Sequence, residues 1–270
     1  MPSITRPITR RNAVLGGLVA VSGAGLASQA VSGCAGEVAG SAAGVTQVAV
    51  IGAIHGRHRT SERFSLTVLE RAVRAFEPDI ILTEIPPDRI EEAKSSFADT
   101  GEVTEPRTRL FPELTEVVFP LSAELGFEIA ACAGWTQAIA DNRSAALKAI
   151  ENDSERASQW AEHRAARAQY SQELAGRADD PLFIHSLEYD AHVQRAQTPY
   201  QIYFDRDLGP GGWTKINAAH TDLINQALDT LRGQRMRALV IFGAWHKYAI
   251  ERSLSFRDDI ERMEARGLFA

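Results

Sequence analysis

The stretch QVAVIGAIH, residues 47–55, decides the class of the fold. It begins with a short apolar run rich in β-branched side chains and turns at a glycine, which predicts a buried strand. Apolar residues then recur at helical spacing over residues 61–76, with Ser61 as the expected N-cap and Pro78 as the stop. A second apolar run, DIILTE, occupies residues 79–84. A strand, a helix and a strand in close succession predict a βαβ unit, whose two strands are parallel.

The rest of the chain continues the alternation of strands and helices. Residues 237–243 form another buried apolar run, and no hairpin signal separates the predicted strands. Residues 141–177 contain no proline and no glycine before Gly176, which predicts one long helix or a helical pair. The remaining expectations are a helix over 119–125, a strand over 126–132, an irregular aromatic segment over 181–212, a helix over 216–231 and a closing helix from about Ile250. The sequence therefore predicts a single α/β domain over residues 45–270, with a central, mostly parallel sheet flanked by helices and a helical insertion or cap in the middle of the chain.

The first residues are typical of an export signal. Arg10 and Arg11 precede a weakly apolar stretch rich in Gly and Ala, which is the layout of a twin-arginine signal. The stretch ends in VSGC, which resembles a lipobox ending at Cys34. We therefore predict a signal peptide over residues 1–33, lipidation of Cys34 and a flexible spacer over residues 35–44. The alternatives are a conventional cleavage site and a transmembrane helix, which the glycines of the stretch disfavour. The expected location is outside the bacterial cytoplasmic membrane, as a membrane-anchored lipoprotein or as a periplasmic or extracellular protein.

Charge is unevenly distributed along the chain. Of the 29 Lys and Arg residues only Arg6, Arg10 and Arg11 precede Glu37, which leaves 26 basic against 35 acidic residues, a net charge of −9, in the rest. A domain this acidic lacks the basic surface that nucleic-acid binding requires, so we exclude nucleic acid as a partner. The two cysteines are too few for a disulfide scaffold.

The two clearest strands end in the same motif. Residues 52–55 are GAIH and residues 243–246 are GAWH, each directly after an apolar run. Ligands of open α/β sheets bind at the carboxyl ends of the strands, and imidazole binds metals and moves protons near neutral pH. His55 and His246 are therefore candidate site residues, and Glu84 ends the second predicted strand in a similar way. Two histidines and a carboxylate predict either a divalent-metal site or an acid–base pair.

Further histidines are candidates for the same site. His58 follows His55 by three residues, and His220 lies about one helical turn after Asn217. We predict His58 and His220 as cofactor-binding residues, with a structural role in the loop or the core as the alternative for each. The sequence contains no Gly-x-Ser-x-Gly elbow, no phosphate-binding P-loop and no His-Glu-x-x-His motif, which disfavours the hydrolases and nucleotide-binding proteins that depend on them.

The paired Gly-x-x-His motifs resemble those of the Tiki/TraB superfamily, whose relatives include the ChaN-like haem-uptake proteins, the GumN-like proteins and the erythromycin esterases. The shared pattern adds a glutamate after the first motif and an Arg/Asn-bearing helix before the second. His55, Glu84 and His246 match the site positions of this pattern. Asn217 matches the asparagine of the helix, and Ile216 stands where an arginine often precedes it.

The resemblance implies three kinds of activity. Tiki proteins are similar to metal-dependent peptidases, the esterases open a lactone with a histidine base, and ChaN-like proteins bind haem. We predict an exported, lipid-anchored, hydrolase-like protein in which His55, Glu84 and His246 hold a divalent metal (Mn, Co or Zn) and cleave a peptide or an ester. Asn217 completes the predicted catalytic set. A metal-free alternative uses His55 as a general base oriented by Glu84.

The alternative from another class is a haem- or ligand-binding surface protein of the ChaN-like type, without turnover. Haem would need an axial histidine or tyrosine, and Tyr200 and Tyr203 are candidates. The expected partners are a small-molecule or peptide substrate and the membrane, which the lipidated Cys34 would reach.

Overall fold

The computed structural model describes residues 44–270. The predicted signal peptide, the predicted lipid-acceptor Cys34 and all but the last residue of the predicted spacer lie outside these residues. Among the helices that are described, none combines the length and the apolar character needed to cross a membrane.

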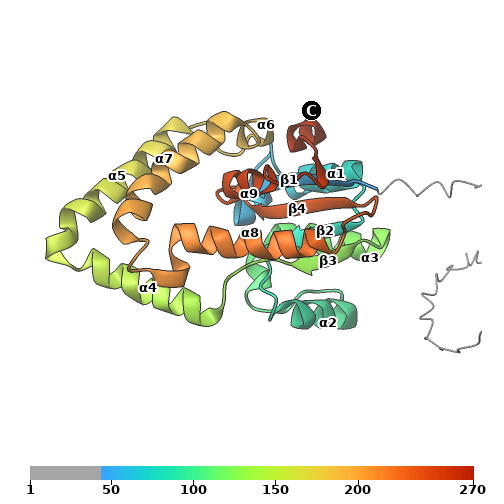
Figure 1. The fold of residues 1–270 in the computed structure, drawn as a ribbon, viewed down its shortest axis with the longest axis horizontal. Coiled ribbons are helices and arrows are strands. Elements are labelled where there is room, and N and C mark those ends of the chain that lie inside the picture. The colour runs from blue at the N-terminus through green and yellow to red at the C-terminus, as the bar shows by residue number, and fades with distance from the viewer. Residues whose placement is uncertain (1–43) are drawn as a thin grey trace, which may run out of the picture. The chain divides into compact units, whose positions relative to one another are not determined.

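A five-stranded sheet forms the centre of the fold (Figure 1). Its strands, in chain order, are β1 (Thr46–Ala53), β2 (Ile80–Thr83), β3 (Glu128–Ala131), β4 (Arg237–Gly243) and β5 (Ile260–Arg262). In space the order is β3-β2-β4-β1-β5, and every neighbouring pair is parallel. β4 therefore lies between the two strands of the predicted βαβ unit. The predicted α/β class and parallel sheet are confirmed, and the short β5 is an addition that the sequence does not signal.

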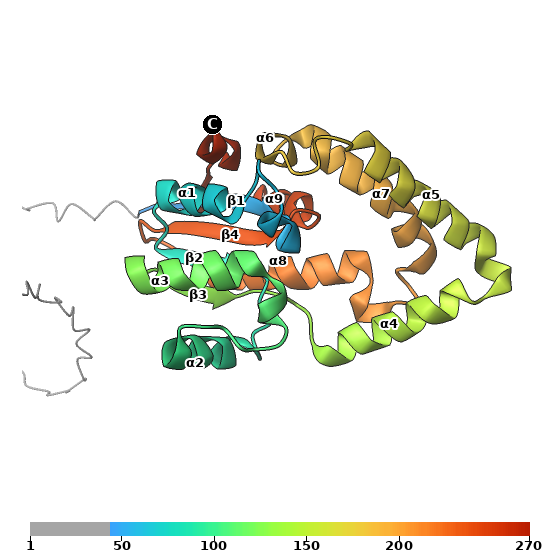
Figure 2. The ribbon, with the colours of Figure 1, turned by 180° about the vertical axis from the view of Figure 1, so that it is seen from behind.

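Helices flank the sheet and extend beyond one end of it (Figures 1 and 2). Two short turns also matter for the site, the 3-10 turn η1 (His55–Arg59) and the π-helical turn η3 (Glu113–Val118). The α-helices are α1 (Leu66–Phe76), α2 (Ile90–Thr100), α3 (Phe119–Leu125), α4 (Gln137–Glu151), α5 (Ala157–Glu173), α6 (Pro181–Ile184), α7 (Leu187–Phe204), α8 (Trp213–Asp229) and α9 (Lys247–Leu254).

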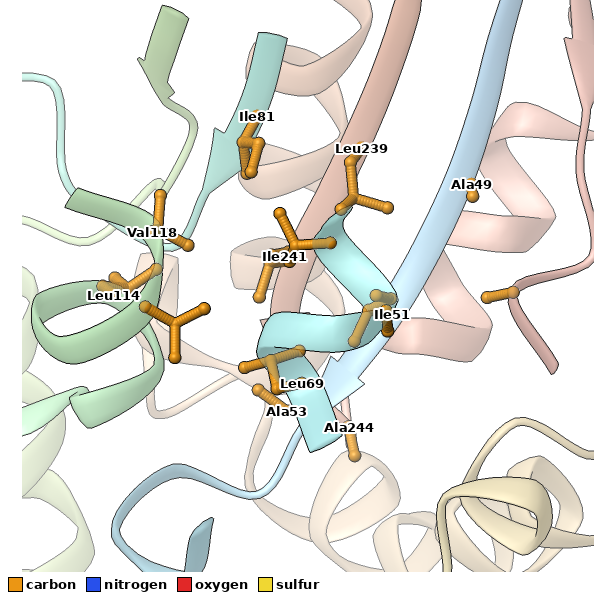
Figure 3. Packing of buried hydrophobic residues seen from close by; sticks show 14 of the residues in the cluster. Ala49, Ile51, Ala53, Leu69, Ile81, Leu114, Val118, Leu239, Ile241 and Ala244 are labelled. Atoms are coloured by element: carbon orange, nitrogen blue, oxygen red, sulfur yellow. The ribbon is translucent and has the colours of Figure 1, made fainter. Parts of the chain in front are cut away.

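Alternate residues of the central strands pack on opposite faces of the sheet. Leu239 and Ile241 of β4 belong to the core that contains α1 and η3 (Figure 3). Val240 and Phe242 belong to the core that contains α8 and α9. Because both faces are covered, the central strands are apolar at nearly every position, which is why they give the clearest signals in the sequence.

Helix α1 starts later than the sequence predicts. Ser65 is its N-cap, and the Ser65 hydroxyl accepts a hydrogen bond from the backbone N–H of Val68. The hydroxyl of Ser61, the predicted N-cap, instead donates to Asp179 at 2.8 Å. The prediction was wrong because both serines precede apolar residues at helical spacing, and both hydroxyls accept from the backbone N–H three residues on, from Phe64 for Ser61 and from Val68 for Ser65.

Helices α4, α5 and α7 form what we call the helical arm, which extends beyond the carboxyl end of the sheet (Figures 1 and 2). Residues 141–177 contain parts of two helices, since Asp153 caps the short turn between α4 and α5. α5 and α7 lie side by side. The arm has a small core of its own, which includes Ile150, Tyr200, Phe204 and Leu208.

The segment predicted to be irregular, residues 181–212, contains the 18-residue helix α7. The hydroxyl of Ser186 caps its start by accepting from the backbone N–H of Tyr189 at 3.2 Å. Pro199 lies inside the helix and masks its pattern, because proline in a sequence usually marks a helix boundary. Three of the aromatic residues of the segment, Tyr189, Tyr200 and Phe204, lie on the buried face of this helix.

Candidate active site at the strand ends

Three neighbouring strands bring the predicted site residues to one edge of the sheet. The spatial order β2-β4-β1 places Glu84, His246 and His55 just after the carboxyl ends of adjacent parallel strands. The two Gly-Ala-x-His motifs follow strands that pair directly, and the backbone N–H of Ala244 donates to the carbonyl oxygen of Ala53 at 2.8 Å. The repeated motif therefore becomes a pair of adjacent turns at the edge where ligands of α/β sheets bind.

Gly243 is the point at which His55 and Glu84 meet. Its backbone N–H donates to Oε2 of Glu84 at 2.8 Å. A Cβ atom at this position would lie 2.6 Å from Nε2 of His55 and 3.3 Å from Oε2 of Glu84. Only glycine leaves room for both side chains here, so the first residue of the second motif has a steric explanation.

His55 pairs with a carboxylate that the sequence did not single out. Its Nδ1 lies 2.6 Å from Oε1 of Glu113, whose side chain is buried in η3. Burial lowers the pKa of His55, but the hydrogen bond and charge of Glu113, with the charge of Glu84, outweigh it and raise the pKa to about 8. His55 also has a φ of 51°, in the left-handed region, and such strain occurs often at functional sites. Residues 111–118, FPELTEVV, carry a second glutamate at position 116, so no local signal singles out Glu113.

His246 is held in one tautomer by the predicted Asn217. The side-chain amide of Asn217 donates to the carbonyl oxygen of Trp213 at 2.8 Å, so its Oδ1 is the atom that faces Nδ1 of His246, also at 2.8 Å. Nδ1 of His246 therefore carries the proton, and Nε2 has a free lone pair. Burial lowers the pKa of His246 to about 3, despite the opposing charge of Glu84. The ring of Trp213 stacks on this imidazole at 4.7 Å.

Glu84, His220 and His246 form a possible metal-binding triad. One potential ligand atom from each side chain lies within 4.8 Å of the other two. Nε2 of His246 lies 3.9 Å from Oε1 of Glu84. The predicted ligand set differs in one member, since His55 is outside this cluster and His220 takes its place.

The hydrogen bonds of His220 test whether the triad fits a metal. The backbone N–H of Gly134 donates to Nδ1 of His220 at 2.8 Å. Burial and the charge of Arg107 lower the pKa of His220 to about 3, so the ring is neutral and its one proton is on Nε2. Within residues 44–270, Nε2 is buried without a hydrogen-bond partner. A zinc-type centre needs a lone pair from each ligand, so in this tautomer the three residues do not fit a three-ligand metal centre. Glu84 and Nε2 of His246 are instead hydrogen-bond acceptors, and the Nε2–H of His220 is a hydrogen-bond donor.

His58, predicted as a cofactor ligand, has a structural role. Its Nε2 accepts from the backbone N–H of Ile54 at 3.0 Å, and its Nδ1 donates to the carbonyl oxygen of Phe64 at 2.7 Å. Both ring nitrogens are therefore occupied, and His58 holds the turn that carries His55.

The tyrosines considered as haem ligands are also engaged in the helical arm. The hydroxyl of Tyr200 accepts from Nε of Arg143 at 3.0 Å, and that of Tyr203 donates to Glu162 at 2.7 Å. Cys132 is buried, and burial raises the pKa of its thiol to about 12, which makes it unreactive.

A cavity of about 500 Å³ opens beside the site. His55, Gly243 and His246 line it on the sheet side, and residues of η1, α4, α5 and α7 line it on the other sides. Its size is that of a small-molecule site. The strand ends therefore face a space that can hold a substrate, and the helical arm forms part of its wall.

No family model, curated protein or solved structure matches the chain.

Proposed function

We propose that this protein is a hydrolase that cleaves an ester or peptide bond at the carboxyl ends of β1, β2 and β4. The observation that carries the proposal is the His55–Glu113 pair, placed beside the acceptor atoms of Glu84 and His246 and facing the cavity. An imidazole oriented by a buried carboxylate, beside a second carboxylate, is an acid–base arrangement. The predicted export signal, with Cys34 as its predicted lipid acceptor, supports the further proposal that the enzyme acts outside the cytoplasmic membrane and is anchored to it by lipid.

The hydrogen-bond donor and acceptors of the Glu84–His220–His246 cluster are arranged to bind a water molecule. A water molecule there would donate to Oε1 of Glu84 and to Nε2 of His246, and it would accept from the N–H of His220. Such a water has the two to four polar partners that buried waters usually have, and it satisfies the unpartnered Nε2 of His220. The water would thus be held close to a carboxylate that can take its proton.

The two histidines have opposite protonation states, which assigns their roles. His55 is largely protonated near neutral pH, since its pKa is raised to about 8, so it acts as the general acid. In the proposed step the water oxygen bonds to the carbonyl carbon, and the proton that it releases goes to Oε1 of Glu84. The bond to the leaving oxygen or nitrogen breaks, and that atom takes a proton from Nε2 of His55. Solvent then returns a proton from Glu84 to His55, which balances the cycle.

This proposed assignment differs from two sequence-based expectations. The metal-free alternative made His55 a base oriented by Glu84, whereas Glu113 is the residue bonded to His55 and makes it an acid. Glu84 is instead bound to the backbone of Gly243 and faces His246. The predicted metal ligands thus become parts of an acid–base site, and the proposed reaction contains no step through a metal.

The decisive experiment compares hydrolysis of nitrophenyl esters and aminoacyl nitroanilides by the wild type and by His55→Gln, Glu113→Gln and Glu84→Gln. Each variant should lose activity by about 10²- to 10⁴-fold, which is the usual contribution of a general acid or base. His192→Gln is the matched control, since His192 pairs with Glu173 on the helical arm and does not line the cavity. Equal activity in all five proteins would overturn the proposal, and so would a Soret band in the purified protein with no hydrolysis. The membrane anchor is tested by fractionating cells that express the full chain or its Cys34→Ala variant. If Cys34 carries the lipid, the variant should be lost from the membrane fraction.

A further inference from the structure

We propose that the cavity beside the strand ends binds the anionic group of a small substrate through Arg57, Arg143 and Arg167. The inference rests on the proposed function only in calling the bound molecule a substrate. The shared chemistry is a carboxylate or a phosphate, which guanidinium groups bind with paired, charge-assisted hydrogen bonds.

The charged side chains that line the cavity are all positive. The lining includes three arginines, from η1, α4 and α5, and neither aspartate nor glutamate. The surrounding chain is acidic, with a net charge of −9 after the predicted signal. A cavity wall with only positive charge in an acidic domain concentrates anions near the site.

The three arginines lack the partners that other arginines of the same region have. Within the described part of the chain, no carboxylate forms an ion pair with Arg57, Arg143 or Arg167. In contrast, Arg156, Arg177 and Arg195, which lie in or beside the helical arm, pair with Asp207, Glu188 and Glu173, respectively. Within residues 44–270 the three guanidinium groups at the cavity are therefore not neutralised by an ion pair with a protein carboxylate.

Two of the three guanidinium groups are held in place by aromatic neighbours. Arg167 lies over the ring of Trp245 at 4.0 Å, a cation–π contact. Arg143 lies 5.7 Å from the ring of Tyr200, and its Nε donates to the Tyr200 hydroxyl. In the described part of the chain no hydrogen bond occupies the terminal nitrogens of Arg143, so they are available for a ligand. Held in this way, the two side chains lose less conformational freedom when an anion binds.

The remaining walls indicate the rest of the substrate. Gln197 is 5% exposed, and its amide makes no hydrogen bond within residues 44–270, so it is a polar group available to a ligand. The indole N–H groups of Trp213 and Trp245 donate to Tyr248 and Tyr170, respectively. Both rings line the cavity. A small molecule with an anionic group, one polar atom for Gln197 and an apolar or planar body fits this surface.

Binding can be tested without any assay of hydrolysis. Because Trp245 contacts Arg167, intrinsic tryptophan fluorescence should report anions in the cavity. Succinate, inorganic phosphate and the neutral amide succinamide are titrated separately into the wild type. Arg167→Met keeps an unbranched chain over Trp245 but removes the charge, and Arg164→Met removes an exposed charge from the same helix as a matched control.

We expect saturable binding of succinate or phosphate, and which of the two binds more tightly identifies the group. Arg167→Met and Arg57→Met should each weaken it by about tenfold or more, as the loss of a charged hydrogen bond predicts, and Arg164→Met should not. No anion binding by the wild type, equal binding in all variants, or equal binding of succinamide would overturn the inference. Anion binding without ester hydrolysis would overturn only the proposed function, and hydrolysis of neutral esters without anion binding would overturn only this inference.

Discussion

Nδ1 of His55 lies 2.6 Å from Oε1 of Glu113, although the two residues are 58 positions apart in the sequence. The contact joins the turn after β1 to the π-helical turn before α3. It fixes the orientation of the imidazole and leaves Nε2 beside Gly243, at the edge of the cavity. The chemistry proposed for this site depends on that orientation and on the protonation that it favours.

Replacing Glu113 by Gln should lower the pKa of His55. The carboxylate is the main reason that this pKa is raised to about 8, and burial alone pushes it below the ordinary value of 6.5. The Cε1 proton of His55, followed by NMR over a pH titration, should therefore show its midpoint move from about 8 to 6.5 or lower. Because His55 must be protonated to act as the acid, the alkaline limb of the pH–rate profile should shift down by a similar amount. An unchanged midpoint would show that Glu113 does not control His55.

Replacing Gly243 by Ala should strongly reduce kcat and have only a small effect on stability. The new Cβ would lie 2.6 Å from Nε2 of His55, so the imidazole must move away from Glu84. We expect kcat to fall by about 10²-fold or more, which a small displacement of catalytic groups can cause. Gly56→Ala is the matched control, since a Cβ there meets no atom within 4 Å and Gly56 does not have a positive φ. Similar activity losses in the two variants would contradict a specific role for Gly243.

The sequence predicts the strand ends well because both faces of the sheet are covered, and buried parallel strands are continuous apolar runs. His55, Glu84 and His246 follow such runs directly, and Asn217 is one helical turn from the end of the Gly-rich loop. Glu113 could not be assigned in the same way. It reaches His55 through the packing of η3 on α1, a tertiary contact that no local pattern encodes.

The role of His220 depends on a contact that the sequence does not show. Its proximity to Asn217 indicated a site residue, and the structure does place it in the cluster with Glu84 and His246. Only the hydrogen bond from Gly134, 86 residues away, determines which of its nitrogens carries the proton. Tautomers follow from three-dimensional contacts, so a list of ligand-type residues could not distinguish a metal ligand from a hydrogen-bond donor.

Removing metals should leave activity unchanged. In the tautomer set by Gly134, only two side chains of the Glu84–His220–His246 cluster, Glu84 and His246, can donate a lone pair to a metal, which is too few ligands for a tight divalent-metal centre. Dialysis against EDTA should therefore leave both kcat and the thermal unfolding midpoint at their starting values. Addition of Mn²⁺, Co²⁺ or Zn²⁺ to the dialysed protein should have no stimulating effect. If EDTA abolished activity and one of these ions restored it, the site would be metal-dependent and the prediction would be wrong.

Acid should destabilise the fold through His185. Its Nε2 accepts from the backbone N–H of Gly52 at 3.0 Å, and its Nδ1 donates to the carbonyl oxygen of Pro181 at 2.7 Å. The bond from Gly52 requires a neutral ring, because a protonated Nε2 has no lone pair to accept it. Burial lowers the pKa of His185 to about 3, against 6.5 for an ordinary histidine. As the pH falls below 6.5 the unfolded chain binds the proton first, so this contribution to the free energy of unfolding decreases from 6.5 towards 3.

Urea unfolding of the wild type and His185→Gln at a series of pH values tests this contribution. The variant should be less stable near pH 7 by about 1–3 kcal/mol, because it disrupts a buried hydrogen-bond pair. Its free energy of unfolding should then fall less steeply with acid than that of the wild type, since one titrating group is gone. Phe269→Leu is the control, because it alters the ring stacked on His185 at 4.7 Å without removing the imidazole. It should lower stability yet keep the wild-type slope, and parallel pH curves for the wild type and His185→Gln would contradict the assignment.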